Sequence, residues 1–223
     1  MSVLHDPPLE RLLAALHARS DTQVAAMAAF YAQTRPPSPD EIKAFRSNKL
    51  VALDRDKAEF CYLLCRAAKA RRIVEAGTSY GVSTLWLAAA VRDNVHDNGG
   101  DGVVIGTEYE PEKAASAREH FEEAGLSQFI DLREGDLRQS LSRIDGPVDF
   151  MLVDIWIAMA RTALALVAPR LRPGAMVVCD NTQQHRAEYA DYFAFLADPA
   201  NGFRTMTLPF GGGLELSVRL GPA

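Results

Sequence analysis

Apolar and polar residues follow two different periods along the chain, and the change comes near residue 70. Before it, apolar residues recur at the spacing of one helix face, which predicts helices throughout the amino-terminal region. After it, short apolar runs alternate with helical patterns, which is typical of a parallel sheet with right-handed helical crossovers. The chain is therefore expected to have an α/β fold with extra helices ahead of the sheet.

Cap signals predict where the first helices begin. They are Asp6 before two prolines, Ser20 or Asp21, and Ser38 followed by a proline and, at the third helical position, Glu41. The helix expected over residues 54–69 has its apolar residues on one stripe and should pack against the sheet. The stripes on the earlier helices fit three roles, namely packing on the same domain, covering a site or joining two subunits, and periodicity leaves all three open.

The remaining chain has the pattern of a strand in seven places, which are residues 72–75, 103–108, 128–133, 148–153, 174–180, 203–208 and 214–220. The last two segments are joined by residues 209–213, which are too few for a helical crossover, so this pair should be antiparallel. The polar segment 93–102 is rich in turn-forming residues and is expected to be a loop.

A strand, a glycine turn and a helix follow one another between Arg72 and Ala90. The strand ends on Glu75, the turn spans Gly77–Gly81, and apolar residues then recur at helical spacing. In an open α/β sheet such a turn lies at the carboxyl end of its strand, where the backbone approaches a ligand closely and the helix start offers free N–H groups. A small molecule is therefore expected to bind here.

Two glycine motifs match this turn in part. Gly77, Ser79 and Gly81 fit the G-x-S-x-G elbow of serine hydrolases, but only helical sequence precedes the turn, and the last histidine, His185, lies before the final two strands. The dinucleotide fingerprint G-x-G-x-x-G requires a second glycine where Ser79 stands, and a side chain there impairs the close approach of a pyrophosphate.

Acidic residues end the neighbouring strands. Glu108, at the tip of the second strand, can accept hydrogen bonds from both hydroxyls of a ribose. Glu110 and Glu112 fit equally well as negative charges in the first turn of the following helix. Asp136, after the third strand, has the position of a helix N-cap that also faces the ligand.

Oxygen ligands follow the fourth and fifth strands. Asp154 comes directly after one of them, and Asp180 with Asn181 comes at the end of the other. Each aspartate alone also fits an ordinary loop cap. Two carboxylates and an amide oxygen at adjacent strand ends suit a hard cation that keeps water or takes substrate oxygens. The set therefore predicts a divalent metal site beside the expected ligand.

Length, composition and net charge limit the number of domains and the kinds of partner that the protein is expected to have. At 223 residues and 48% hydrophobic composition, the chain is expected to form one domain, with residues 1–52 as a helical extension and 53–223 as the core. A net charge of −5 argues against nucleic acids and membrane surfaces as partners. Without an apolar run near the ~20 residues that cross a bilayer, or a signal-peptide core, the protein is expected to be cytoplasmic.

The three cysteines, Cys61, Cys65 and Cys179, are expected to be buried thiols without disulfides.

The segment Glu75–Ser83 resembles the acidic strand end and G-x-x-x-G of S-adenosylmethionine-dependent methyltransferases. The chain from about Leu53 onward resembles the catechol and caffeoyl-coenzyme A type of cation-dependent class I O-methyltransferases, on the strength of that segment and of Thr107-Glu108, Gly135-Asp136, Asp154, Asp180-Asn181 and Gly212-Gly213-Leu214. The resemblance implies a Rossmann-like, seven-stranded, mostly parallel sheet with one antiparallel strand and helices on both faces. It also implies methyl transfer to a hydroxyl of a small phenolic or catechol-like acceptor.

The same resemblance implies a set of site residues. Contacts to S-adenosylmethionine are expected from Glu75, Gly77, Ser79, Gly81, Ser83, Glu108 and Asp136. Ligation of a divalent cation, with magnesium as the expected ion, is implied for Asp154, Asp180 and Asn181. The amino-terminal helices are implied to take part in substrate access and in a homodimer.

One position departs from the family pattern. The family has a lysine shortly after the first metal-binding aspartate that helps to deprotonate the substrate hydroxyl, and here Asp154 is followed by Ile-Trp-Ile-Ala. His185 is a replacement base if its loop reaches the site, and it is otherwise an exposed histidine without a chemical role. Lys57 is a second candidate. Trp156 fits an apolar wall for a flat acceptor, and it also fits plain core.

Three other functions remain open on the sequence. A metal-independent methyltransferase acting on another nucleophile, such as an amine, would keep the cofactor residues. A serine hydrolase would depend on Ser79. A protein that binds the cofactor without catalysis would explain the missing lysine.

Overall fold

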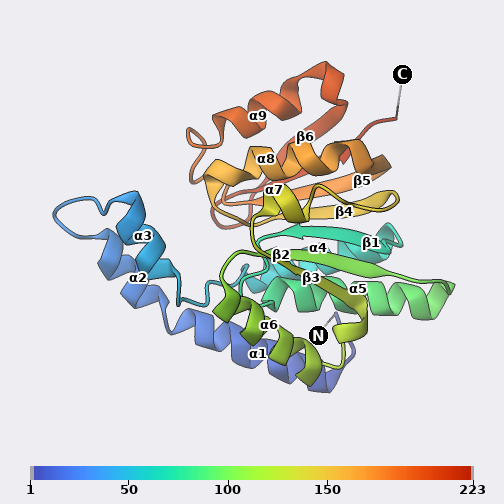
Figure 1. Cartoon of the computed structure of the whole chain (residues 1–223), viewed down its shortest axis with the longest axis horizontal. Helices are drawn as coiled ribbons and strands as arrows, with labels where there is room; N and C mark the ends of the chain where they lie inside the picture. Colours follow the sequence, from blue (N-terminus) through green and yellow to red (C-terminus); the bar gives the residue numbers. More distant parts are fainter. Residues whose placement is uncertain (1–2, 222–223) are drawn as a thin grey trace.

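The computed structural model describes residues 3–221, so residues 1–2 and 222–223 of the expected domain lie outside the described part. Within it, seven strands form one sheet in the order β3-β2-β1-β4-β5-β7-β6 (Figure 1). The strands are β1 (Arg72–Ala76), β2 (Val103–Glu108), β3 (Ile130–Glu134), β4 (Val148–Val153), β5 (Leu171–Asp180), β6 (Phe203–Leu208) and β7 (Leu214–Arg219). Strand β7 runs antiparallel to β5 and β6, and the other neighbouring pairs are parallel. The Rossmann-like sheet with one reversed strand is therefore confirmed.

Helices cover both faces of the sheet (Figure 1). One face carries α1 (Pro7–Asp21), α4 (Arg55–Ala67), α5 (Val82–Asn98) and α6 (Pro111–Glu123), and the other carries α7 (Leu137–Ser140), α8 (Ile157–Val167) and α9 (Ala190–Ala197). Short 3-10 turns occur at Ser127–Phe129, Ala168–Arg170 and Pro199–Asn201. Helices α2 (Val24–Tyr31) and α3 (Pro39–Arg46) project from one end of the molecule.

The core has two layers because side chains of a strand alternate between its faces. Ile73 and Phe150 are buried in the layer under α4 and α5. Val74 and Met151, one position further along each strand, are buried under α7 and α8. Both layers are fully closed to water, which explains why these strands read as continuous apolar runs rather than as alternating ones.

Two of the predicted helix starts are confirmed by their caps. Oδ1 of Asp6 accepts a hydrogen bond from the amide of Leu9 at 3.1 Å. Ser38 and Glu41 form a reciprocal capping box, because the amide of Ser38 donates to the Glu41 carboxylate at 2.7 Å and the amide of Glu41 donates to the Ser38 hydroxyl at 3.3 Å. The predicted start at Ser20 or Asp21 is wrong, since α1 continues through these residues. The Ser20 hydroxyl instead accepts a hydrogen bond from the amide of Ala52.

The loop predicted over residues 93–102 is also wrong in its first half, because α5 extends to Asn98. Its polar side chains bind helix α4 and the linker that follows it. The Asn94 amide donates to the carbonyls of Cys65 and Ala70, and the Tyr62 hydroxyl donates to Asp93 at 2.7 Å. These partners lie far away in the sequence, so local composition resembled a loop.

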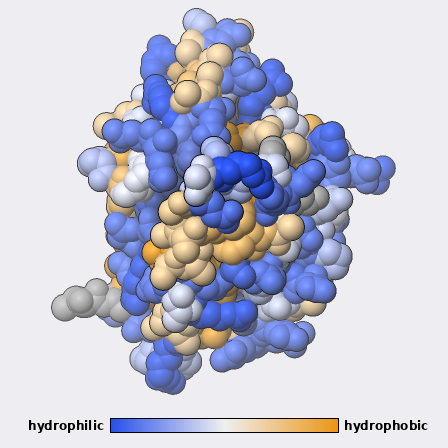
Figure 2. All heavy atoms as spheres, turned by 90° about the vertical axis from the view of Figure 1, so that its left-hand side faces the viewer, coloured by the Kyte–Doolittle hydropathy of each residue, from blue (hydrophilic) through white to orange (hydrophobic). Residues whose placement is uncertain are grey.

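The first two helices differ in how they are packed. Leu9, Leu13 and Leu16 of α1 are buried in the same core as Trp86 of α5, so α1 packs on its own domain. All eight residues of α2 are at least partly exposed although the helix is almost wholly apolar. Figure 2 looks onto the side that carries α2 and α3 in Figure 1, and it shows apolar atoms gathered near the centre of that face.

The three cysteines are free and buried, as expected. Within residues 3–221, none of the helices combines the length and the apolar character that a bilayer crossing requires.

Candidate functional site

The register of the sheet aligns the ends of four strands. Ala76 of β1 lies opposite Thr107 of β2 and Val153 of β4, and Val153 lies opposite Cys179 of β5. The residues that follow these positions, which are Gly77, Glu108, Asp154 and Asp180, therefore form the next row at the carboxyl edge of the sheet. The structure thus brings together side chains that the sequence predicted for one site.

The glycine turn is held tightly against the tip of β4. Gly77 has φ +102°, and a Cβ at this position would overlap the backbone oxygen of Asp154. The amide of Asp154 in turn donates to the carbonyl of Ala76 at 3.0 Å. Ser79 also adopts a left-handed backbone, with φ +49°. Such conformations are costly for residues other than glycine, and they occur mainly where the fold requires them for a site.

Glu75 joins the end of β1 to the start of α5. Its carboxylate is fully buried and accepts hydrogen bonds from the hydroxyls of Thr78 at 2.9 Å, Ser83 at 2.7 Å and Thr84. Burial raises the pKa of Glu75, and the three hydroxyl donors oppose this shift. In this conformation the polar groups of Glu75 and Ser83 bind each other, so both residues hold the turn in shape.

Glu108 lies directly beside the turn. Oε2 of Glu108 accepts the amide of Ser79 at 2.7 Å, and Oε1 accepts the amide of Glu110 at 2.8 Å. The backbone oxygen of Glu108 accepts the amide of Gly135 at 2.8 Å. Gly135 has φ +97°, and the space into which its Cβ would point is open. Glu108 therefore stands between the glycine turn and an open space at the tip of β3.

Gly81 and Asp136 complete this edge. Gly81 is the N-cap of α5 with φ +83°, and a Cβ there would press against the ring of Phe121. Asp136 is the N-cap of α7, where its carboxylate accepts the amide of Arg138 at 2.9 Å and pairs with the Arg138 guanidinium. The guanidinium contact lowers the pKa of Asp136. Asp136 is thus the helix cap that the sequence predicted, next to Gly135.

Lys57 of α4 lies under the tip of β5. Its side chain is only 1% exposed, and its ammonium lies 2.7 Å from Oδ2 of Asp54 and 2.7 Å from Oδ1 of Asp180. Oδ2 of Asp180 accepts the side-chain amide of Asn181 at 2.8 Å. Burial acts to lower the pKa of Lys57, but its hydrogen bonds and attraction to Asp180 and Asp54 outweigh burial, so the pKa is raised. Lys57 is therefore a buried ammonium ion that compensates the charge of Asp180.

Asp154 has a different environment. Its carboxylate makes neither a hydrogen bond nor an ion pair with any residue in the described range 3–221. Burial and the negative charges of Asp180 and Glu75 raise its pKa to about 8. A carboxylate crowded by like charges and left without a partner is a position where a bound cation would relieve the repulsion.

The donor set fits a hard cation. Asp154 and Asp180 supply carboxylate oxygens, and Asn181 supplies an amide oxygen on a left-handed residue with φ +57°. The bonds to Lys57 and Asn181 leave lone pairs on both Asp180 oxygens, because an ionised carboxylate accepts more than one hydrogen bond per oxygen. Across residues 3–221, no group of three or more His, Cys, Asp and Glu side chains is arranged as a metal-binding cluster.

The other predicted residues lie around this edge. His185 lies on the turn after Asn181, where its Nδ1 is 2.9 Å from Oε1 of Glu188 and its ring is exposed. Trp156 is 45% exposed, so the interpretation as plain core is wrong. The guanidinium of Arg46 lies 5.5 Å from the centroid of the Trp156 ring. Sequence reasoning gave Arg46 no role, because its partners lie on other elements and no local pattern marks it.

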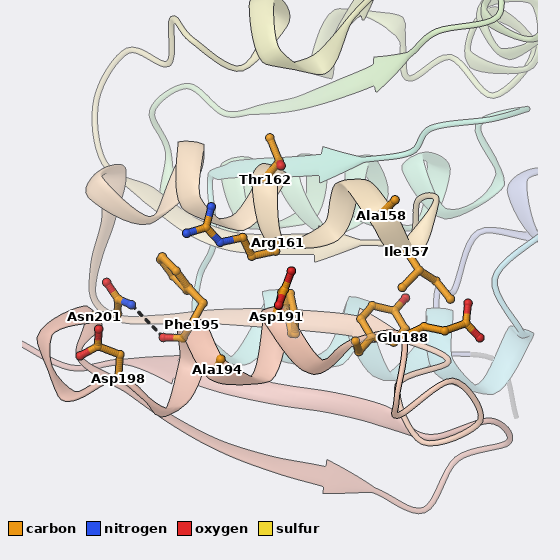
Figure 3. A pocket seen from close by; sticks show the side chains of 12 residues that line it. Ile157, Ala158, Arg161, Thr162, Glu188, Asp191, Ala194, Phe195, Asp198 and Asn201 are labelled. Atoms are coloured by element: carbon orange, nitrogen blue, oxygen red, sulfur yellow. Dashed lines mark hydrogen bonds between the residues drawn. The ribbon is translucent and has the colours of Figure 1, made fainter.

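A separate groove of about 770 Å³ lies between α8 and α9 (Figure 3). Arg161, Asp191 and Phe195 line it, and the guanidinium of Arg161 lies 5.7 Å from the Phe195 ring centroid. The residues that line this groove include none of those predicted for the cofactor or the metal. It is therefore distinct from the strand-end site.

The comparisons with known proteins agree with this geometry. A family model described as a methyltransferase domain matches residues 74–182, which run from β1 to the residue after Asn181. Nearly half of the chain is therefore similar to a methyltransferase domain. This family match covers the glycine turn, Glu108 and the paired aspartates.

Catechol O-methyltransferases of Niastella koreensis and Mycobacterium tuberculosis are 31% and 32% identical to the chain, over 139 and 136 residues. Each match covers 59% of this chain and 58% or 57% of the relative, so the chain spans little more than half the length of these relatives. The O-methyltransferase TomG from Streptomyces achromogenes, solved in complex with SAM, is 22% identical with a TM-score of 0.66, over 91% of this chain and 99% of that chain. This likeness shows a shared fold.

Proposed function

We propose that this chain binds S-adenosylmethionine at the Gly77–Gly81 turn and transfers its methyl group to a hydroxyl of a small phenolic or catechol-like acceptor. The observation that carries the proposal is the position of Glu108, whose carboxylate binds the Ser79 amide beside the open space at Gly135. The curated relatives named as catechol O-methyltransferases and the neighbour solved with SAM support this activity.

The cofactor residues have separate roles in this proposal. Glu108 accepts hydrogen bonds from the ribose hydroxyls with the lone pairs that its backbone partners leave free. Gly77, Ser79 and Gly81 shape the turn so that the backbone approaches the amino-acid end of the cofactor closely. Glu75 and Ser83 keep the turn rigid, and Asp136 caps α7 where the adenine is expected.

Asp154, Asp180 and Asn181 would hold a divalent cation, with magnesium as the proposed ion. The pKa of a free phenol is about 10, and such an ion, when bound, would lower the pKa of the acceptor hydroxyl. Lys57 fixes the carboxylate of Asp180 from below and limits the negative charge of the site. Trp156, exposed at the mouth, presents a flat apolar wall to the acceptor.

Lys57 and His185 are the two candidates for the base that removes the proton of the acceptor hydroxyl. The raised pKa of Lys57 keeps its ammonium protonated, so Lys57 is suited to positioning Asp180 and not to accepting a proton. His185 is near the metal residues in sequence and its Nδ1 is oriented by Glu188. We therefore propose His185 as the group that accepts the acceptor's proton, with Asp154 next to the reacting oxygen.

The amino-terminal helices are proposed to join two copies of the chain. The exposed apolar helix α2 supports this part of the proposal, because contiguous exposed apolar surface is typical of an interface. The oligomeric state in solution tests it by light scattering.

The deciding experiment for the function is a transfer assay with labelled S-adenosylmethionine and catechol as the probe acceptor, with magnesium or with excess chelator. The proposal predicts transfer with magnesium, loss of transfer in chelator and recovery when magnesium is restored. If the protein methylates an amine and the chelator does not affect the rate, the protein is instead a metal-independent methyltransferase. Ester hydrolysis that disappears in Ser79→Ala would replace it by a hydrolase.

A further inference from the structure

Arg46 is the last residue of α3, one of the two helices that project from one end of the molecule (Figure 1). Its guanidinium lies 5.5 Å from the ring centroid of Trp156 and 5.8 Å from that of Tyr31. Both rings are exposed, at 45% and 42%. Arg46 therefore lies against two exposed aromatic rings, one of which is close in sequence to Asp154.

Arg46 lacks an anionic partner. Within residues 3–221 its guanidinium forms neither an ion pair nor a hydrogen bond, and its Nε is buried without an acceptor. A guanidinium has five N–H donors, and a buried donor without an acceptor is unfavourable. Several other arginines bind acids, as Arg35 binds Glu41 and Arg66 binds Asp97. Arg46 thus presents a cation that no acidic side chain within residues 3–221 pairs with.

Arg46 lies close to the proposed metal residues. The Trp156 ring beside its guanidinium belongs to the residue two positions after Asp154, which follows the tip of β4. An anion bound to Arg46 would therefore lie near the tip of β4.

We propose that Arg46 binds a carboxylate substituent of the methyl acceptor, while Trp156 and Tyr31 contact its aromatic ring. The planar guanidinium fork matches the two oxygens of a carboxylate, and one guanidinium compensates a single negative charge. This inference rests on the proposed methyl transfer. It makes Arg46 a specificity residue that selects acidic phenols over neutral ones.

The test compares two matched acceptors, 3,4-dihydroxybenzoate and its methyl ester, in the wild type and in Arg46→Gln. The wild type is expected to have the higher kcat/KM for the acid. Arg46→Gln is expected to lower kcat/KM for the acid by about 10- to 100-fold, mainly through KM, because a charge-assisted bidentate contact is lost. The value for the ester is expected to stay within about threefold, since the ester presents no charge to Arg46.

Three controls make the outcome specific. Arg35→Gln removes an exposed arginine that binds Glu41 outside the site, and it should leave kcat/KM unchanged for both acceptors. Arg46→Lys keeps the charge without the fork and should recover part of the preference for the acid. Thermal unfolding and S-adenosylmethionine affinity should be the same in Arg46→Gln and the wild type, which separates a lost contact from a misfolded α3.

Two results would overturn the inference. One is an equal loss for acid and ester in Arg46→Gln, and the other is a wild type that does not prefer the acid. If neither acceptor is methylated, the proposed function fails, and the inference is then decided by calorimetry with the protein loaded with S-adenosylhomocysteine. The inference is supported if the wild type binds 3,4-dihydroxybenzoate and Arg46→Gln weakens this binding. It is contradicted if the wild type does not bind the acid, or if Arg46→Gln binds it as tightly as the wild type.

Discussion

The ammonium of Lys57 lies 2.7 Å from Oδ1 of Asp180, which connects helix α4 to the carboxyl end of strand β5. Both side chains are buried, so Asp180 depends on Lys57 for compensation of its charge. Replacing Lys57 by methionine should lower the free energy of unfolding by about 3–5 kcal/mol, because it leaves a buried carboxylate uncompensated. Urea unfolding followed by fluorescence measures this change.

The control for Lys57 lies on the same helix. Arg55 forms an exposed ion pair with Glu59 at 2.9 Å, so Arg55→Gln should cost about 0–1 kcal/mol. The double variant Lys57→Met with Asp180→Asn should recover part of the lost stability, since it removes both charges. Equal effects of Lys57→Met and Arg55→Gln would show that the buried pair does not contribute.

Gly77 is predicted to tolerate no side chain. Gly77→Ala combines a strained φ with overlap onto the backbone of Asp154, whereas Gly125→Ala meets only the strain, because the space beside Gly125 is open and its φ is +64°. Gly125→Ala should therefore cost about 1–2 kcal/mol, and Gly77→Ala should cost more. Paired denaturation curves measure both values, and similar costs would contradict the close contact between the turn and β4.

Glu108 is predicted to control cofactor affinity. Glu108→Gln exchanges a carboxylate oxygen, which accepts hydrogen bonds, for an amide NH2 group, which donates them. The change should raise the Kd for S-adenosylmethionine by about 10- to 100-fold, because a hydrogen bond to a charged group is lost. Glu110→Gln removes the same charge two residues away, at the N-cap of α6, and should change Kd by less than about threefold. Calorimetry on both variants gives the ratio, and equal values would remove Glu108 from the site.

Asp154 is predicted to be needed for metal stimulation and dispensable for the cofactor. Asp154→Ala should abolish the response of methyl transfer to magnesium, because it removes a carboxylate that is proposed to bind the ion. Asp191→Ala removes an exposed carboxylate on α9 and should keep the full response. A magnesium response that survives in Asp154→Ala would move the metal site elsewhere.

The sequence predicted the sheet accurately where its strands are buried on both faces. The bounds of β2 and β4 match the predicted segments, because a buried parallel strand reads as an apolar run with sharp ends. Strand β5 begins at Leu171, three residues before its predicted start, since Pro173 and Gly174 resemble a turn. The same reliance on local composition ended α5 too early, as the partners of Asn94 lie on α4.

For the site, the sequence predicted which residues end the strands but not how their charges are paired. Glu108 and Asp154 could be identified because a residue after a parallel strand always lies at the same edge. The burial of Lys57 beside Asp180 and the position of Arg46 over Trp156 depend on contacts between distant segments, which periodicity does not encode. Both were therefore visible only in the structure.

The central claim is that the strand-end residues Gly77, Glu108 and Gly135 bind S-adenosylmethionine. A crystal structure of the chain grown with S-adenosylhomocysteine tests it most directly. The account predicts the ribose hydroxyls within hydrogen-bonding distance of the Glu108 carboxylate and the ligand lying over Gly135. Density for the ligand in the groove between α8 and α9, or strand ends that stay empty at saturating ligand, would contradict it.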